Sequence, residues 1–164
     1  MGVRLEREAV SVSQKHAPRR RSREVALQTL YAADVAAHGG RTSAPCAEDV
    51  FEGIAENFDL PEGARAFAKQ LACGTVEARG PIDELVEKHA VNWRVSRMAT
   101  VDRNILRLAV YELLYTETPV SVVLDEAIEL AHRFGSDASP PFVNGVLDAV
   151  ATATLGRRGE GVSS

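Results

Sequence analysis

Four arginines, Arg19, Arg20, Arg21 and Arg23, form the densest group of cations in the sequence. Cations at the start of a helix can neutralise nucleic-acid phosphates, and the free N–H groups of the first helical turn also attract anions. Residues 1–23 carry seven Lys or Arg and two Glu, a net charge of +5, whereas the whole chain carries −4. This asymmetry suggests a segment that binds a polyanion, although a basic tail without a function would have the same composition.

Gln28 and Tyr31 follow the arginines on one face of the same predicted helix. Single-stranded RNA is held by cations along its backbone and by aromatic rings that stack on its bases. Tyr31 could therefore stack on a base, and Gln28 could read a base edge. The alternative is that Tyr31 packs in the core with its hydroxyl hydrogen-bonded. Phe142, at the start of the last predicted helix, is a second candidate for stacking with the same alternative.

Glu129 and His132 form an E-x-x-H pair, which is half of the motif that holds two iron ions in four-helix bundles. Such a site needs a second pair and two further glutamates, and none of the other three histidines belongs to a second pair. A solvated helix face explains the pair better. The sequence also shows no Ser/His/Asp arrangement and no glycine-rich phosphate loop. We therefore expect neither catalysis nor a bound metal or cofactor.

The elements that must position these side chains are helices. The stretch 101–114 lacks Gly and Pro, and Arg103, Asn104 and Arg107 share one face of its first half. Its second half, continuing to Tyr115, is apolar nearly all round, and a helix of that kind must be covered on all sides. It is therefore predicted to be the central helix of a helical core, and Pro119 marks its end.

Six further segments repeat apolar residues at helical spacing, and no segment alternates like a strand. They lie within 22–38, 47–58, 61–80, 81–89, 120–134 and 139–155. The sequence thus predicts an all-α fold of about seven helices, with two three-helix subdomains, about 19–80 and 81–155, around the central helix. Ser22 and Ser121 are expected to cap helices, Phe134 to face inward, and Gly145 to mark a close helix contact. Residues 1–18 are expected to be a disordered basic arm and residues 156–164 a flexible tail.

Composition fits one domain, because 164 residues with 45% hydrophobic content can bury a substantial core. No apolar run approaches the ~18 residues of a membrane helix, and the N-terminus lacks the apolar segment of a signal peptide. Cys46 and Cys73 have no metal-binding spacing and are expected to be reduced thiols. We therefore expect a cytoplasmic protein.

Three blocks of the sequence resemble the NusB family of bacterial transcription antitermination factors. They are Arg19–Tyr31, Val101–Leu113, and Asp125–Ala131 continuing through Phe134–Gly135 to Phe142–Asp148. The blocks occur in the family's order with the family's spacing, and together they cover roughly residues 19–150. Between residues 41 and 80 the resemblance is limited to helical character.

The resemblance implies an all-helical protein without catalysis that binds boxA RNA, a single-stranded element of ribosomal RNA transcripts. It implies a partner, the ribosomal protein NusE, and a complex that joins elongating RNA polymerase with other Nus factors. RNA contact by Arg19, Arg20, Arg21, Arg23, Gln28, Tyr31 and Phe142 is then the favoured interpretation. The resemblance leaves open whether the chain is a monomer or a homodimer, and which RNA sequence it prefers. The alternative function is a helical protein-interaction module without RNA binding.

Asp102 and Arg103, at the start of the central helix, are the residues that we expect to contact NusE. The alternative for Asp102 is that an acid in a first turn stabilises any helix, by roughly 0.3–1 kcal/mol. One departure from the family pattern lies nearby. The family commonly has Asp-Ser-Pro-Lys-Phe, whereas this chain has Ala138–Phe142 with Pro141 in place of the lysine, so the contribution of this loop to binding stays open.

Overall fold

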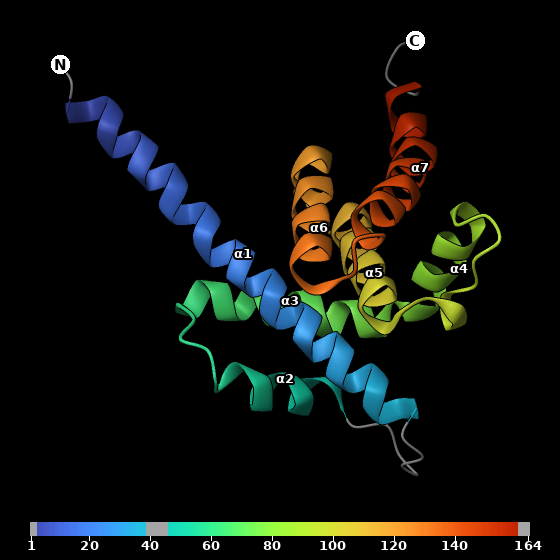
Figure 1. Cartoon of the computed structure of the whole chain (residues 1–164). Helices are drawn as coiled ribbons and strands as arrows, with labels where there is room; N and C mark the ends of the chain where they lie inside the picture. Colours follow the sequence, from blue (N-terminus) through green and yellow to red (C-terminus); the bar gives the residue numbers. More distant parts are fainter. Residues whose placement is uncertain (1–2, 39–45, 161–164) are drawn as a thin grey trace.

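Seven α-helices and one short 3-10 helix make up the described part of the chain, which contains no strand (Figure 1). The computed structural model describes residues 3–38 and 46–160, and the side chains of 18–38 and 46–155. The elements are α1 (Val3–His38), α2 (Ala47–Ala55), α3 (Glu62–Glu77), α4 (Arg79–His89), η1 (Val95–Arg97), α5 (Thr100–Tyr115), α6 (Val120–Phe134) and α7 (Ser139–Glu160). The predicted all-α fold with seven helices is confirmed.

Helix α5 is the centre of the packing. It contacts α1, α3, α4, α6 and α7, and every residue from Arg103 to Leu113 is buried. Helices α1, α2 and α3 pack against one another, while α6 and α7 pack together and α4 contacts α7. Figure 1 shows these two groups meeting at α5. An apolar helix with a neighbour on each side is the arrangement expected when no face can be left in water.

One hydrophobic core joins the two groups of helices. Each of the seven α-helices contributes at least one side chain that is essentially inaccessible to solvent. Examples are Val25, Phe51, Leu71, Ile82, Leu106, Val123 and Leu147. Because the core is continuous, the two groups fold around a shared interior instead of forming separate domains.

Helix α1 begins far before the expected start at Ser22. It runs from Val3 through Pro18, most of the segment over which the sequence predicted disorder. Pro18 has no backbone N–H to donate, which is why the sequence pointed to a break there. Ser22 does not cap the helix. Its Oγ lies 2.9 Å from the carbonyl oxygen of Pro18 and 2.8 Å from that of Ala64, and so it joins α1 to α3.

Two other helix boundaries also differ from expectation. Helix α7 continues to Glu160, beyond the expected tail boundary at residue 156. Pro119, not Ser121, occupies the N-cap position of α6, and no side chain caps that end. The expectation for Phe134 was also wrong, because its ring is 38% exposed. No helix within the described residues combines the length and the apolar character that crossing a membrane requires.

The close helix contact expected at Gly145 occurs at another glycine. Gly145 is exposed, and a Cβ atom there would have no neighbour within 4 Å. At Gly74 of α3, by contrast, a Cβ atom would overlap the ring of Tyr111 of α5. The absent side chain at Gly74 therefore lets α3 and α5 approach with a tyrosine ring between them.

Candidate RNA-binding and partner-binding sites

The four arginines of α1 do not form a single basic surface. Arg23 is 4% exposed and Glu112 of α5 is 2% exposed. The Arg23 Nε and Nη2 atoms lie 2.6 and 3.0 Å from the two carboxylate oxygens of Glu112. A buried charge of this kind needs its partner, because either group alone would be desolvated without compensation. Arg23 is therefore a structural residue, and the prediction that it contacts phosphate is wrong.

The other three arginines are exposed, in three different settings. Arg20 donates from Nε and Nη2 to Glu126 of α6, at 3.2 and 3.1 Å. The guanidinium of Arg19 lies 5.1 Å from the ring centroid of Phe67, within the range of a cation–π contact. Arg21 is exposed and has no ion pair with a described side chain. Exposed ion pairs are weak, so Arg20 can exchange its carboxylate for a phosphate.

Tyr31 lies at the surface, where 43% of the residue is exposed. This excludes the alternative that its ring is part of the core. Tyr31 and the half-buried Gln28 line an open groove of about 420 Å³, together with Leu27, Ala32, Ile54, Val101 and Phe134. The expected stacking ring and the expected amide thus share one groove, and both are accessible from solvent.

A second pocket, of about 190 Å³, contains two of the three remaining candidates, Phe142 and Asp102. It is lined by Trp93, Met98, Ala99, Asp102, Ala138 and Phe142. Phe142 meets Trp93 edge to face, with centroids 5.9 Å apart and an interplanar angle of 64°, and Trp93 is 53% exposed. Trp93 was not among the expected binding residues. Its signal in the sequence is a large aromatic side chain in a polar link between helices.

Asp102 has an unusual environment for a first-turn acid. Its Oδ1 atom is buried and has no hydrogen-bond partner within the described part of the chain. Most buried polar atoms in proteins are hydrogen-bonded, so this oxygen is an acceptor that a water molecule or a donor from a partner would satisfy. Because Asp102 follows Val101 directly, this pocket and the Tyr31 groove begin at the same turn of α5.

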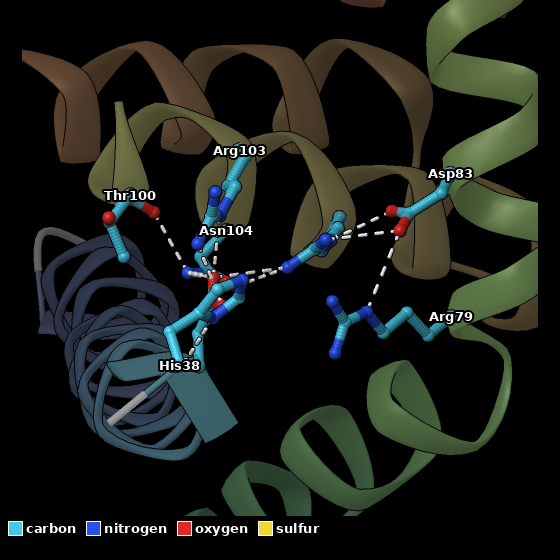
Figure 2. A network of polar contacts seen from close by, with 8 residues as sticks. His38, Arg79, Asp83, Thr100, Arg103 and Asn104 are labelled. Atoms are coloured by element: carbon cyan, nitrogen blue, oxygen red, sulfur yellow. Dashed lines mark hydrogen bonds and ion pairs between the residues drawn. The ribbon is translucent and has the colours of Figure 1, made fainter. Parts of the chain in front are cut away.

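Arg103 cannot serve as an exposed partner contact, which corrects the expectation for it. It is 8% exposed, and its Nε and Nη2 atoms lie 2.6 and 2.8 Å from the carboxylate oxygens of Asp34 of α1. Asn104 donates to the same carboxylate at 3.0 Å, and Arg107 at 3.2 Å. Figure 2 shows Arg103 and Asn104 directed toward the end of α1 that carries His38.

Arg107 extends this buried network from α1 to α4. Its Nε and Nη2 atoms lie 2.8 and 3.0 Å from the carboxylate oxygens of Asp83. Burial raises the pKa of Asp34, but hydrogen bonds from Arg103 and Asn104 and the charges of both arginines outweigh it, so that this pKa lies below its ordinary value. The polar face of α5 is therefore buried, and its ion pairs connect α5 to α1 and α4.

The fold, the exposed cations and the aromatic grooves define a small all-helical binding domain. The NusB family model matches residues 20–152, and the chain belongs to the NusB family. It is 49% identical over 144 residues to transcription antitermination protein NusB of Anaeromyxobacter dehalogenans, covering 87% of this chain and 96% of that one.

Two solved structures share the fold. NusB of T. maritima superposes with a TM-score of 0.73 at 35% identity, covering 82% of this chain and 90% of that chain. The crystal structure of antitermination factors NusB and NusE in complex with dsRNA gives a TM-score of 0.71 at 29% identity, covering 84% of this chain and 98% of that chain. The agreement extends over both groups of helices.

Proposed function

We propose that this chain is a transcription antitermination factor that binds boxA single-stranded RNA of ribosomal RNA transcripts together with NusE. The complex joins elongating RNA polymerase through other Nus factors and promotes processive transcription of ribosomal RNA. Membership of the NusB family supports the proposal, as does the similarity to a complex of NusB and NusE with RNA. The observation that carries it is the placement of exposed arginines and an exposed tyrosine along one helix.

Arg20 and Tyr31 are eleven residues apart, about three helical turns, so they lie on one side of α1, and both are exposed although Leu27 between them is buried. At 1.5 Å per residue, Arg20 and Tyr31 are separated by about 17 Å along the helix axis. A single strand lying on this face would meet cations first and a stacking ring later, which is the combination that single-stranded RNA requires. Arg19, Arg20 and Arg21 supply phosphate contacts, Tyr31 stacks on a base, and Gln28 reads a base edge.

The Asp102 pocket is the part of the surface that we assign to NusE. Stabilisation of a first helical turn accounts for an acid at this position, but it does not account for a buried oxygen to which no described residue donates a hydrogen bond. A basic side chain of NusE would satisfy that oxygen and would lie against the rings of Trp93 and Phe142, where a cation is also favoured. Phe142 thus lies where RNA and NusE would both be within reach.

The direct test is a fluorescence anisotropy titration of the boxA RNA from this organism's ribosomal leader, with and without NusE. Binding that falls with rising salt and tightens with NusE supports the proposal. A chain that binds NusE normally but shows no affinity for boxA RNA under either condition is a protein-interaction module, and the proposal is then wrong.

The assignment of Asp102 is tested by calorimetric titration of NusE. Asp102→Lys reverses the charge, whereas Asp102→Asn keeps a side chain suited to a helix start. We expect the Lys variant to lose NusE binding while it still binds RNA alone through α1. Asp59→Lys, at an exposed acid in the link before α3, is the control for a general charge effect. Equal NusE affinity for the wild type and Asp102→Lys would leave Asp102 as a helix-start residue only.

A further inference from the structure

The groove beside Tyr31 has a second exposed aromatic wall. Phe134, the last residue of α6, also lines it and is 38% exposed. Ile54 of α2 and Val101 of α5 also line it. Two exposed rings on neighbouring helices, with an apolar lining and one amide from Gln28, give a groove that is accessible to solvent on its open side.

Two ion pairs connect α1 and α6, and Arg133 of one pair directly precedes Phe134 of the groove. Arg20 of α1 pairs with Glu126 of α6, and Arg133 of α6 pairs with Glu24 of α1. In both pairs the arginine is the outer member. The arginine side chains are 51% and 45% exposed, against 17% and 13% for the glutamates. In each pair the guanidinium group is therefore more accessible to a ligand than the carboxylate.

Arg133 is also placed next to the aromatic wall. Its guanidinium carbon lies 5.3 Å from the centroid of the Phe134 ring. The Arg133 side chain thus lies beside the Phe134 ring that could stack on a base. It is also placed to bind the phosphate attached to that base. Arginine suits both contacts, because it binds phosphate through its planar fork and stacks on flat rings.

We propose that the groove holds one unstacked RNA base between Tyr31 and Phe134, and that Arg133 leaves Glu24 to bind the phosphate of the same nucleotide. This inference rests on the proposed RNA binding. It adds Phe134 as a second stacking ring and Arg133, held by Glu24 in the free protein, as a further phosphate contact. Charge favours an RNA occupant over an apolar protein segment, because the outer members of both ion pairs are cations. Glu24 then competes with the RNA for Arg133. Because this ion pair must break before Arg133 can bind the phosphate, Glu24 lowers the affinity of the protein for RNA.

The test uses the full chain and a single-stranded boxA RNA in fluorescence anisotropy titrations. Phe134→Leu keeps an apolar side chain but removes the π face. It should weaken binding roughly 5- to 150-fold, which corresponds to about 1–3 kcal/mol for one stacked base. Tyr115→Leu is the matched control, because Tyr115 is 51% exposed and lies about 21 Å from Val101 along α5. It should leave RNA affinity unchanged.

Glu24→Gln separates this proposal from a merely structural role for the ion pair. Loss of a purely structural pair would leave RNA affinity unchanged or reduce it, whereas release of a restrained arginine should raise it severalfold. Arg133→Ala should flatten the dependence of log K on log salt by about 0.7, the value for one phosphate on a single strand. With 5-iodouridine at successive positions of the RNA, photo-crosslinking should reach the peptides of Tyr31 and Phe134 at one position.

Several outcomes would overturn the inference. If Phe134→Leu stays within twofold of the wild type while Arg21→Ala weakens binding, the groove holds no base although the protein binds RNA. If Phe134→Leu instead abolishes a dimer in sedimentation equilibrium, or abolishes NusE binding, and RNA affinity is unchanged, the groove belongs to a protein. A wild-type chain that binds no boxA RNA would refute the proposed function itself, which is a distinct result.

Discussion

Arg19 and Arg21 of α1 are exposed, whereas Arg23 is buried. Substitutions at the two kinds of position should therefore affect RNA binding and fold stability in opposite ways. Replacing the exposed Arg19 and Arg21 by alanine should weaken RNA binding and leave the fold intact. Replacing the buried Arg23 should destabilise the fold and leave the salt dependence of RNA binding unchanged. The difference follows from the partner of Arg23, since Glu112 is 2% exposed and receives both hydrogen bonds from it.

The magnitudes can be worked out from these positions. Each phosphate contact on a single strand contributes about 0.7 to the slope of log K against log salt. Losing Arg19 and Arg21 should therefore flatten the slope by about 1.4. Removing one member of a buried ion pair costs about 3–5 kcal/mol. At roughly 2–4 °C per kcal/mol for a chain of this size, Arg23→Ala should lower the Tm by about 6–20 °C.

The assay combines anisotropy titrations over a series of KCl concentrations with urea unfolding followed by circular dichroism. Arg23→Met with Glu112→Leu provides the matched control, because exchanging a buried pair for apolar residues often restores stability. The folded double variant should bind RNA with the wild-type salt slope. A slope flattened by about 0.7 in this variant, the value for one phosphate contact, would show that Arg23 reaches phosphate, and the structural assignment would fail.

Three further predictions concern stability. Asp34→Asn should cost about 3–5 kcal/mol in urea unfolding, because the buried Arg103 has no other ion-pair partner in the described chain. The pKa of Asp34 is lowered in the folded protein, so its stabilising contribution is complete above the unfolded value of about 3.9 and is lost as the pH falls below it. Unfolding between pH 2 and 5 should accordingly depend less steeply on pH in Asp34→Asn than in the wild type. Gly74→Ala should cost about 1–3 kcal/mol, because the added methyl overlaps Tyr111, and Tyr111→Leu in the same chain should recover part of it.

Periodicity and breaker residues predicted the helices well because both act locally. Gly39 and Pro61 separate segments whose apolar residues recur at helical spacing, and the structure places helix ends beside both. The errors lie where a residue's usual local role, such as capping a helix, gives way to a contact with a distant part of the chain. Residues 1–18 were expected to be disordered, whereas α1 runs from Val3 through Pro18. Ser22 was expected to cap that helix, and its hydroxyl instead contacts the carbonyl oxygen of Ala64 on another helix.

The candidate site was less predictable because charge partners lie far apart in the sequence. Arg23 and Glu112 are separated by 89 residues, and Arg103 and Asp34 by 69. Nothing near either arginine distinguishes a buried cation from an exposed one. The one available signal is Asp34 itself, a lone acid among alanines and valines, which indicates a charged partner from another helix.

Helical geometry nevertheless requires that neighbouring arginines of α1 lie in different environments. Successive residues of an α-helix point about 100° apart, so Arg19, Arg20 and Arg21 point in three directions and would meet different phosphates of one RNA strand. Arg19 and Arg23 are one turn apart, and both guanidinium groups lie over the ring of Phe67, at 5.1 and 5.7 Å. That side of α1 faces the protein, and the buried pair between Arg23 and Glu112 fixes the rotation of α1 about its own axis. With that rotation fixed, Arg20 and Tyr31 stay exposed on either side of the buried Leu27, so under the proposed function Arg23 would act by orienting the residues that contact RNA.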